Sequence, residues 1–273
     1  MPVVEAHGAR IPTIGLGTMT LKDEAAVNAI SEALKMGYRH LDTAWFYRNE
    51  KENGEGLRAS GVPRDQVFIC TKVRETHLNP DDFAKTVDES LSNLKLPYVD
   101  LLLIHWNNPA VPFKTSIGAL NKAKRDGKTK HIGVANFTSS MLDEAWAVTD
   151  APLVCNQIEV HPFINQDKVI AASKKRGMAI VAYVPIARGK VPGSEVLEKI
   201  GKAHGKSAAQ VSLRYLTQQG LIPIPRTATP AHLKENLDVF DWSLSAEEMA
   251  ELKKLNATGY RVVNPPHAPK WDA

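Results

Sequence analysis

The sequence has few cysteines, no long apolar run and no signal-peptide pattern. Its two cysteines, Cys70 and Cys155, lie far apart, each inside an apolar stretch. This usage predicts buried reduced thiols rather than a disulfide framework, so we expect a cytoplasmic protein. The longest uncharged apolar run, near GMAIVAYVPIA, falls short of the ~20 residues that a membrane span needs. We therefore expect no membrane association.

An excess of one charge sign is also missing. Lys plus Arg number 34 against 30 Asp plus Glu, so the net charge of +4 is weak and dispersed. The basic clusters KAKRDGKTKH and SKKRG end helix-like stretches, where cations complement the helix dipole on a solvated surface. We expect a small-molecule partner rather than a nucleic acid. No surplus apolar face is evident, so a monomer is expected.

What the sequence does contain is an alternation of short apolar runs with stretches of helical periodicity. The runs occupy residues 13–18, 38–42, 67–72, 99–105, 131–136, 154–159, 178–183 and 221–225. Eight such units closing on themselves make an α/β fold of the (β/α)8 TIM-barrel type. A doubly wound sheet is the alternative. No linker or repeat divides the 273 residues, so we expect 1–273 to be a single domain.

Three segments fall outside the eight units. The central HG of VVEAHGARIP predicts a β-hairpin capping the base of the barrel. The connection before the last strand is long enough for two helices, 193–204 and 207–219. The C-terminal NATGYRVVNPPHAPKWDA, rich in proline and aromatic residues, is expected to form a loop over the barrel mouth.

The ends of the apolar runs are unusually polar. In barrels the chemistry lies at the C-terminal ends of the strands. The residues at these ends are Gly17, Thr18, Asp42, Lys72, His105, Asn136, Gln157, Glu159, Tyr183 and Arg226, and Tyr47 follows the second strand. Each residue taken singly has a packing or solvation explanation. Together they are expected to surround one barrel mouth.

Tyr47 and its expected neighbours could together donate a proton. A phenol has a pKa of about 10, too high for efficient proton donation at neutral pH. Lys72 is the strand-end cation nearest in barrel order, and its charge is expected to lower that pKa. Asp42 on the adjacent strand would keep Lys72 ionised. His105 would hydrogen-bond a carbonyl oxygen and orient it.

Competing chemistries lack their motifs. No two of the nine histidines lie within about twenty residues of each other, and HExxH is absent, so no metal is expected and a metal-dependent barrel hydrolase is disfavoured. There is no GxSxG nucleophile elbow. GLGT lacks the third glycine of a Rossmann fingerprint.

The stretch IPIPRTATPAHLKENL predicts an anion site. Thr229 is a good N-cap and Pro230 a good first helical residue, so a helix with free amide groups should begin there. Arg226 and Thr227 precede this helix and His232 lies in its first turn. Barrels often build a phosphate site after their last strands. An ordinary capped helix is the alternative.

Seven segments resemble the aldo-keto reductase superfamily along essentially the whole chain. They are GYRHLDTAWFYRNE, TKV, LLLIHW, GVANF, NQIEVHP, AYVPIARG and IPRTATPAHLKEN, in the family's order. The sequence is most similar to bacterial members of the 2,5-diketogluconate reductase type. The resemblance implies a barrel that reduces an aldehyde, ketone or keto-sugar to an alcohol with NADP(H).

The resemblance also implies a role for each polar residue. Tyr47 would be the general acid, with Asp42, Lys72 and His105 as its catalytic partners. The cofactor-binding residues would be Gly17, Thr18, Asp42, Asn136, Gln157, Tyr183, Arg188, Arg226, Thr227, His232, Glu235 and Asn236. Within this set Asn136 and Gln157 would hold the carboxamide and Tyr183 would stack on the nicotinamide ring. The substrate pocket would be lined by Met19, Trp45, Phe46 and Trp106.

The chain departs from the family pattern in places. His232 stands where the family usually has arginine, and a mostly neutral imidazole lacks the bidentate, stacking contact of arginine. We therefore expect NADP(H) to be preferred and NAD(H) to be accepted. Ala135 and Val184 replace the usual serines, and Met19 replaces a frequent aromatic residue, which broadens the pocket. A cofactor-binding barrel that acts as a redox sensor or scaffold without turnover is the alternative function.

Overall fold

The computed structural model describes residues 1–272 and confirms the barrel. Its eight-stranded sheet is parallel throughout, with the strands in the order β10-β9-β8-β7-β6-β5-β4-β3. The strands are β3 (Leu16–Gly17), β4 (His40–Asp42), β5 (Phe68–Val73), β6 (Val99–Ile104), β7 (Thr129–Ala135), β8 (Leu153–Glu159), β9 (Ala179–Tyr183) and β10 (Ile222–Pro223). The N–H groups of Gly15 and Gly17 donate to the carbonyls of Pro223 and Pro225, both at 3.0 Å. These bonds join the first strand to the last and close the ring.

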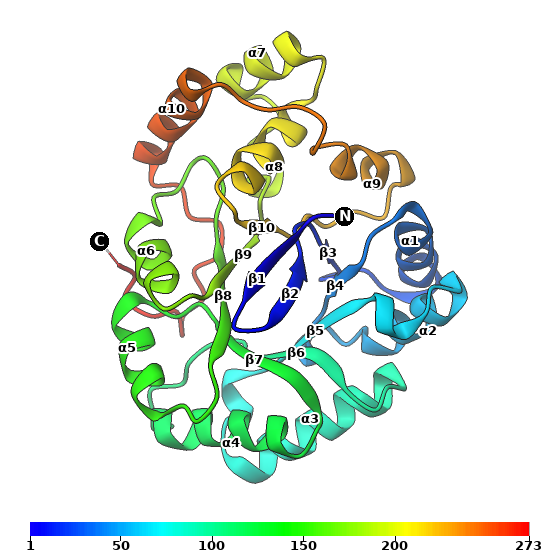
Figure 1. Cartoon of the computed structure of the whole chain (residues 1–273), viewed down its shortest axis with the longest axis vertical. Helices are drawn as coiled ribbons and strands as arrows, with labels where there is room; N and C mark the ends of the chain where they lie inside the picture. The colour runs from blue at the N-terminus through cyan, green and yellow to red at the C-terminus, as the bar shows by residue number, and fades with distance from the viewer. Residues whose placement is uncertain (273) are drawn as a thin grey trace.

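Helices surround the sheet (Figure 1). They are α1 (Asp23–Met36), α2 (Glu50–Ser60), α3 (Pro80–Leu94), α4 (Phe113–Arg125), α5 (Ser139–Val148), α6 (Asp167–Lys175), α7 (Glu195–His204), α8 (Ala208–Gln218), α9 (Pro230–Leu237) and α10 (Ala246–Lys254). In α3 the apolar residues Phe83, Val87 and Leu91 recur at helical spacing and are all buried against the barrel. No helix within residues 1–272 combines the length and apolar character needed to cross a membrane.

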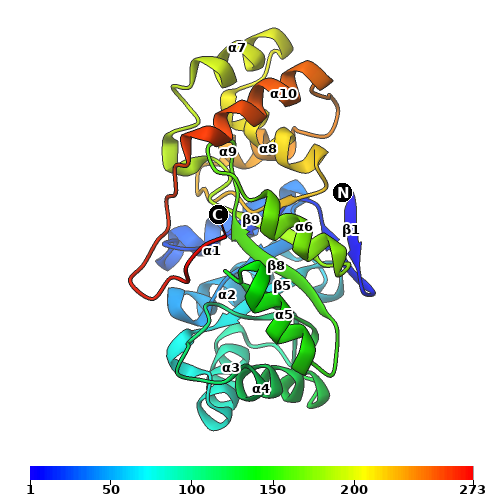
Figure 2. The same cartoon turned by 90° about the vertical axis from the view of Figure 1, so that its left-hand side faces the viewer.

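The expected hairpin closes one end of the barrel. Its strands are β1 (Val3–Ala6) and β2 (Ala9–Pro12). His7 and Gly8 both have positive φ, at 47° and 81°, as a type I′ hairpin turn requires. The hairpin crosses the middle of the barrel in Figure 1. Figure 2 shows the C-terminal tail, residues 259–272, on the side opposite to β1.

Two local expectations need correction. Thr229 occupies the N-cap position of α9, but its side chain makes no capping hydrogen bond. The last strand is also shorter than its apolar run, because Pro223 and Pro225 have no N–H to extend the ladder. The expected pair of helices before that strand is confirmed as α7 and α8.

The barrel interior is filled by side chains. One buried cluster lies within the ring of strands and includes Cys70, Leu101, Leu103, Cys155 and Val181. Both cysteines are free thiols. A second, larger apolar cluster lies between the strands and the helices. Because the interior is packed and the hairpin covers one end, the C-terminal ends of the strands are the place for a site.

Candidate active site

A buried ion pair joins the ends of β4 and β5. The Lys72 Nζ lies 2.5 Å from the Asp42 Oδ1 and donates to the Thr43 carbonyl at 2.7 Å. Asp42 lies opposite Cys70 in the strand register, so Lys72, two residues further along β5, faces the same way. The Gln157 side-chain amide donates to the other Asp42 oxygen at 2.7 Å. Both oxygens of Asp42 are therefore hydrogen-bonded.

Tyr47 reaches this pair from the loop after β4. It ends a single 3-10 turn, Trp45–Tyr47, that Arg48 terminates in the left-handed conformation at φ 55°. The Lys72 Nζ lies 5.3 Å from the centroid of the Tyr47 ring. The His105 ring meets the Tyr47 ring edge-on, with their centroids 5.8 Å apart. The structure thus brings together the residues expected to donate a proton and orient a carbonyl.

The charges in this cluster follow from burial and from the neighbours. Burial lowers the pKa of Lys72, but Asp42 and Tyr47 outweigh it, and the pKa lies above its ordinary value. Lys72 is therefore charged at neutral pH, as expected. Burial, followed by the charge of Lys72, lowers the pKa of His105 well below its ordinary value, so this imidazole is neutral.

Tyr47 differs from the expectation. Burial raises its pKa, and the opposing charge of Lys72 only partly offsets that effect. The expected net lowering is therefore wrong, because the loss of solvation outweighs the nearby cation. At neutral pH the phenol keeps its proton and has Lys72 beside it to stabilise the phenolate.

Three polar side chains expected at the nicotinamide also converge on this mouth. The Tyr183 hydroxyl donates to the Asn136 Oδ1 at 2.6 Å, and the Asn136 amide donates to the His105 carbonyl at 3.0 Å. Gln157, on β8, accepts the Asn136 N–H at its backbone carbonyl at 2.9 Å, and its side chain donates to Asp42. Asn136 and Val184 both have positive φ, 62° and 53°. Backbone strain of this kind concentrates at functional sites.

Two other expected cofactor residues have structural contacts. A Cβ on Gly17 would lie 2.8 Å from the Ile224 carbonyl oxygen, so glycine is needed where the ring closes. The buried Thr18 hydroxyl donates to the Asp42 carbonyl at 3.0 Å. Arg188 is exposed and left-handed, at φ 46°, in the turn Ala187–Gly189.

The start of α9 is open to solvent, as the anion-site hypothesis requires. Arg226 and His232 are exposed beside it. The Thr227 hydroxyl accepts from the Thr229 N–H at 3.0 Å, and Thr229 caps nothing. The first-turn amides of a helix have no acceptor within the helix. Glu235 and Asn236 lie one turn further on, partly and fully buried respectively.

The expected substrate-pocket residues divide into two kinds. Met19 and Phe46 are 43% and 48% exposed at the rim, whereas Trp45 and Trp106 are buried. Trp106 is covered by the C-terminal tail, with the His267 ring at 5.3 Å and the Trp271 ring at 6.0 Å between centroids. The tail therefore forms a wall of the mouth.

Two carboxylates fasten the tail, and the sequence did not reveal either contact. Glu159, at the end of β8, accepts the N–H of Val262 at 2.6 Å and that of Val263 at 2.8 Å. Asp272 accepts the N–H and the hydroxyl of Ser139, at 2.8 and 2.6 Å, at the start of α5. The expected loop over the mouth is confirmed, and it is held at both ends.

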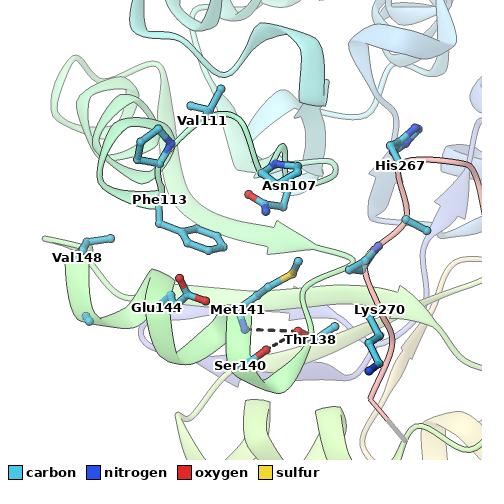
Figure 3. A pocket seen from close by; sticks show the side chains of 15 residues that line it. Asn107, Val111, Phe113, Thr138, Ser140, Met141, Glu144, Val148, His267 and Lys270 are labelled. Carbon is cyan, nitrogen blue, oxygen red and sulfur yellow. Dashed lines mark hydrogen bonds between the residues drawn. The ribbon is translucent and has the colours of Figure 1, made fainter.

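A groove of roughly 850 Å³ lies beside this wall (Figure 3). It runs between the loop after β6, the helix α5 and the tail. Its lining includes Asn107, Val111, Phe113, Met141, Glu144, His267 and Lys270. Asp42, Tyr47, Lys72 and His105 do not line it, so the groove is separate from the candidate active site.

Comparison with known proteins agrees with this arrangement. The model of the family described as "Aldo/keto reductase family" matches residues 13–257. A methylglyoxal reductase of Escherichia coli O157:H7 is 37% identical over 266 residues, which cover 96% of this chain and 99% of the relative. A glyoxal reductase of Bacillus subtilis is 36% identical, covering 92% of this chain and 91% of its own.

Solved structures give the same result. A protein assigned as a 2,5-diketo-D-gluconic acid reductase B is 45% identical with a TM-score of 0.97, covering 100% of this chain and 98% of its own. The aldo-keto reductase of Bombyx mori in complex with NADP is 31% identical with a TM-score of 0.89, covering 96% and 95%. This chain belongs to the aldo/keto reductase family and is an oxidoreductase that acts on carbonyl compounds.

Proposed function

We propose that the protein reduces aldehydes or ketones to alcohols with NADPH, and that Tyr47 donates the proton. The observation that carries this proposal is the placement of a protonated phenol between a charged Lys72 and a neutral His105. The cluster lies at the C-terminal end of the barrel, where such folds hold their active sites. Relatives named methylglyoxal and glyoxal reductases support a small aldehyde as substrate.

The residues at the mouth fit a nicotinamide cofactor. The Gln157 side-chain oxygen accepts no hydrogen bond from residues 1–272, although its amide group is fixed by Asp42. This leaves an acceptor for a carboxamide beside Asn136, whose N–H donates to the Gln157 backbone carbonyl at 2.9 Å. At the far end, the uncapped start of α9 and the exposed Arg226 suit a phosphate. A nicotinamide cofactor bound there would supply the hydride for the carbonyl carbon.

Each residue of the cluster then has one task. His105 and Tyr47 hydrogen-bond the carbonyl oxygen and fix its position. As negative charge develops on that oxygen, Tyr47 transfers its proton to it. Lys72 stabilises the phenolate that remains, and Asp42 keeps Lys72 charged. Burial of the pair excludes water and strengthens these interactions.

The proposal extends to cofactor choice and cellular setting. Arg226 and Thr227 would contact a 2′-phosphate, so NADP(H) is preferred, while His232 in place of arginine leaves NAD(H) acceptable. The free, buried Cys70 and Cys155 support a reducing compartment such as the cytoplasm. A single-domain monomer without nucleic-acid or membrane partners completes the proposal.

The test follows the absorbance of NADPH with glyceraldehyde as substrate. We expect Tyr47→Phe to lower kcat by about 10²- to 10⁴-fold, because it removes the general acid. NADPH affinity should stay unchanged. Tyr98→Phe removes a phenol oxygen far from the mouth and serves as the control. Equal activity of Tyr47→Phe and the unaltered protein would refute the role of Tyr47. Binding of NADPH without turnover of any aldehyde would instead favour a sensor or scaffold.

A further inference from the structure

Asn49, two residues after Tyr47, has a buried side chain that links three segments at the barrel mouth. The residue is fully buried. Its amide group donates to the carbonyls of Thr18 and Leu21, at 2.7 and 2.9 Å. Its side-chain oxygen accepts from the Thr43 hydroxyl at 3.0 Å. Because both N–H groups and the oxygen of the amide are engaged, the side chain is held in one orientation.

The bond between Thr43 and Asn49 closes the loop that carries Tyr47. Thr43 is itself tied to β5, because its carbonyl accepts from the Lys72 Nζ at 2.7 Å. Inside the loop the Tyr47 N–H donates to the Ala44 carbonyl at 2.9 Å, which makes a single turn. The loop is thus fixed at its start by Lys72 and closed across its two ends by the side chain of Asn49.

Arg48, between Tyr47 and Asn49, shows that the loop needs such support. Its φ of 55° lies in the left-handed region, which a residue with a Cβ keeps only where the surrounding structure imposes it. On the outer side Arg48 pairs with Glu89 at 3.6 Å, but these side chains are 58% and 44% exposed, and such a pair contributes little. The buried hydrogen bonds of Asn49 are therefore the stronger support.

The position of the Tyr47 hydroxyl decides how well it donates a proton. A general acid must lie within hydrogen-bond reach of the oxygen that it protonates, and a misplacement of about 1 Å can lower the rate about 100-fold. Building on the proposed reductase function, we propose that Asn49 is a positioning residue, which holds the loop so that Tyr47 lies between Lys72 and His105. Asn49 acts through Tyr47 and contacts neither substrate nor cofactor.

The test measures kcat with NADPH and glyceraldehyde. Thr43→Val removes the hydroxyl that donates to Asn49 with little change of shape, whereas Asn49→Asp places a carboxylate oxygen against two carbonyls. We expect kcat to fall about 10-fold in Thr43→Val and about 100-fold in Asn49→Asp. The KM for glyceraldehyde and the affinity for NADPH should each change less than about threefold, because only the transition state is affected. Thr43→Ser keeps the hydroxyl and should recover most of the rate.

A second measurement combines Thr43→Val with Tyr47→Phe. A residue that acts through the Tyr47 hydroxyl has no further effect once that hydroxyl is gone. We therefore expect Thr43→Val to lower the residual kcat of Tyr47→Phe less than about twofold. A loss by the same factor in both backgrounds would overturn the proposal, because the change would then act on the barrel mouth without involving Tyr47.

The matched control is Asn121→Asp on α4. Asn121 is only 2% exposed, its amide donates to the Ile117 carbonyl at 3.0 Å, and its oxygen accepts the Ala151 N–H at 3.0 Å. This variant should lose stability, as Asn49→Asp does, and keep its kcat. An equal fall of kcat in the two variants would also overturn the proposal, because kcat would then follow stability alone.

A spectroscopic measurement separates this inference from the proposed function. The chain has six tyrosines, so the fluorine NMR spectrum of protein labelled with 3-fluorotyrosine is simple, and Tyr47→Phe identifies the signal of residue 47. We expect this signal to shift and broaden in Thr43→Val and to stay unchanged in Asn121→Asp. That result supports the inference even if no aldehyde is turned over and the proposed reduction fails. An unchanged signal in Thr43→Val overturns the inference and leaves the reductase function intact.

Discussion

The ammonium of Lys72 lies 2.5 Å from the carboxylate of Asp42, and neither side chain is more than 2% exposed. Removing one member of such a pair leaves the other charge buried and alone. Removing both leaves only a packing change. The effect on stability therefore depends on whether one partner or both partners are removed.

We expect Lys72→Met to lower the free energy of unfolding by about 3–5 kcal/mol, because Asp42 becomes an uncompensated buried charge. The double variant with Asp42→Leu should recover part of that loss. Urea unfolding followed by tryptophan fluorescence measures both. A double variant whose loss equals the sum of the two single losses would show that the charges do not interact.

The stability of the protein should fall in acid because of His40. Burial lowers the pKa of His40 from 6.5 to about 4, with Asp42 opposing. Below pH 6.5 the unfolded chain takes up a proton at this ring before the folded protein does. The contribution is therefore complete above pH 6.5 and lost as the pH falls towards 4, by about 3 kcal/mol.

The measurement compares His40→Met with the unaltered protein in urea at several pH values between 7 and 4, because His105 titrates in the same direction and must cancel. The variant should show the smaller loss of stability on acidification. Parallel curves for the two proteins would mean that His40 does not contribute.

Cofactor preference should respond to the residue at the start of α9. His232→Arg supplies a permanent charge and a planar fork for a 2′-phosphate, so we expect the ratio of kcat/KM with NADPH to that with NADH to rise about tenfold. Arg226→Met should lower the same ratio. The idea fails if His232→Arg improves both cofactors equally, since the gain would then not involve the 2′-phosphate.

The hydrogen bonds that Glu159 accepts from Val262 and Val263 should hold the C-terminal tail in place. Glu159→Gln keeps the shape but turns one acceptor into a donor that faces the N–H of Val262 or Val263. We expect the KM for glyceraldehyde to rise about tenfold, by the loss of a charged hydrogen bond, with NADPH affinity unchanged. Limited proteolysis should cleave the tail faster than in Glu144→Gln, an exposed control on α5. Equal rates of tail cleavage in the two variants would show that Glu159 does not hold the tail in place.

The sequence predicted the cluster of Asp42, Tyr47, Lys72 and His105 because one rule applies to all parallel barrels. The strand ends meet at one face, so polar residues that end successive apolar runs must come together. The hairpin could also be predicted from the sequence, because His7 and Gly8 suit a turn with two positive φ values.

Other features depend on three-dimensional packing that no local pattern reports. The sign of the pKa change at Tyr47 depends on how deeply the loop is buried. The hydrogen bond between Glu159 and Val262 joins residues 103 positions apart, and no sequence pattern predicts a contact at that separation. Glycine is required at position 17 because the backbone of Ile224 packs against it where the ring closes, which leaves no room for a Cβ.

The seam between β3 and β10, made by Gly15 and Gly17 with Pro223 and Pro225, sets an order of assembly. A chain made from its N-terminus cannot close the ring until Pro225 has left the ribosome. By then Tyr47 and its partners in the active-site cluster have long emerged from the ribosome. Arg226 and the tail emerge only after Pro225. Until closure the edge of β3 remains unpaired, so the nascent chain must protect that edge longer than any other part of its sheet.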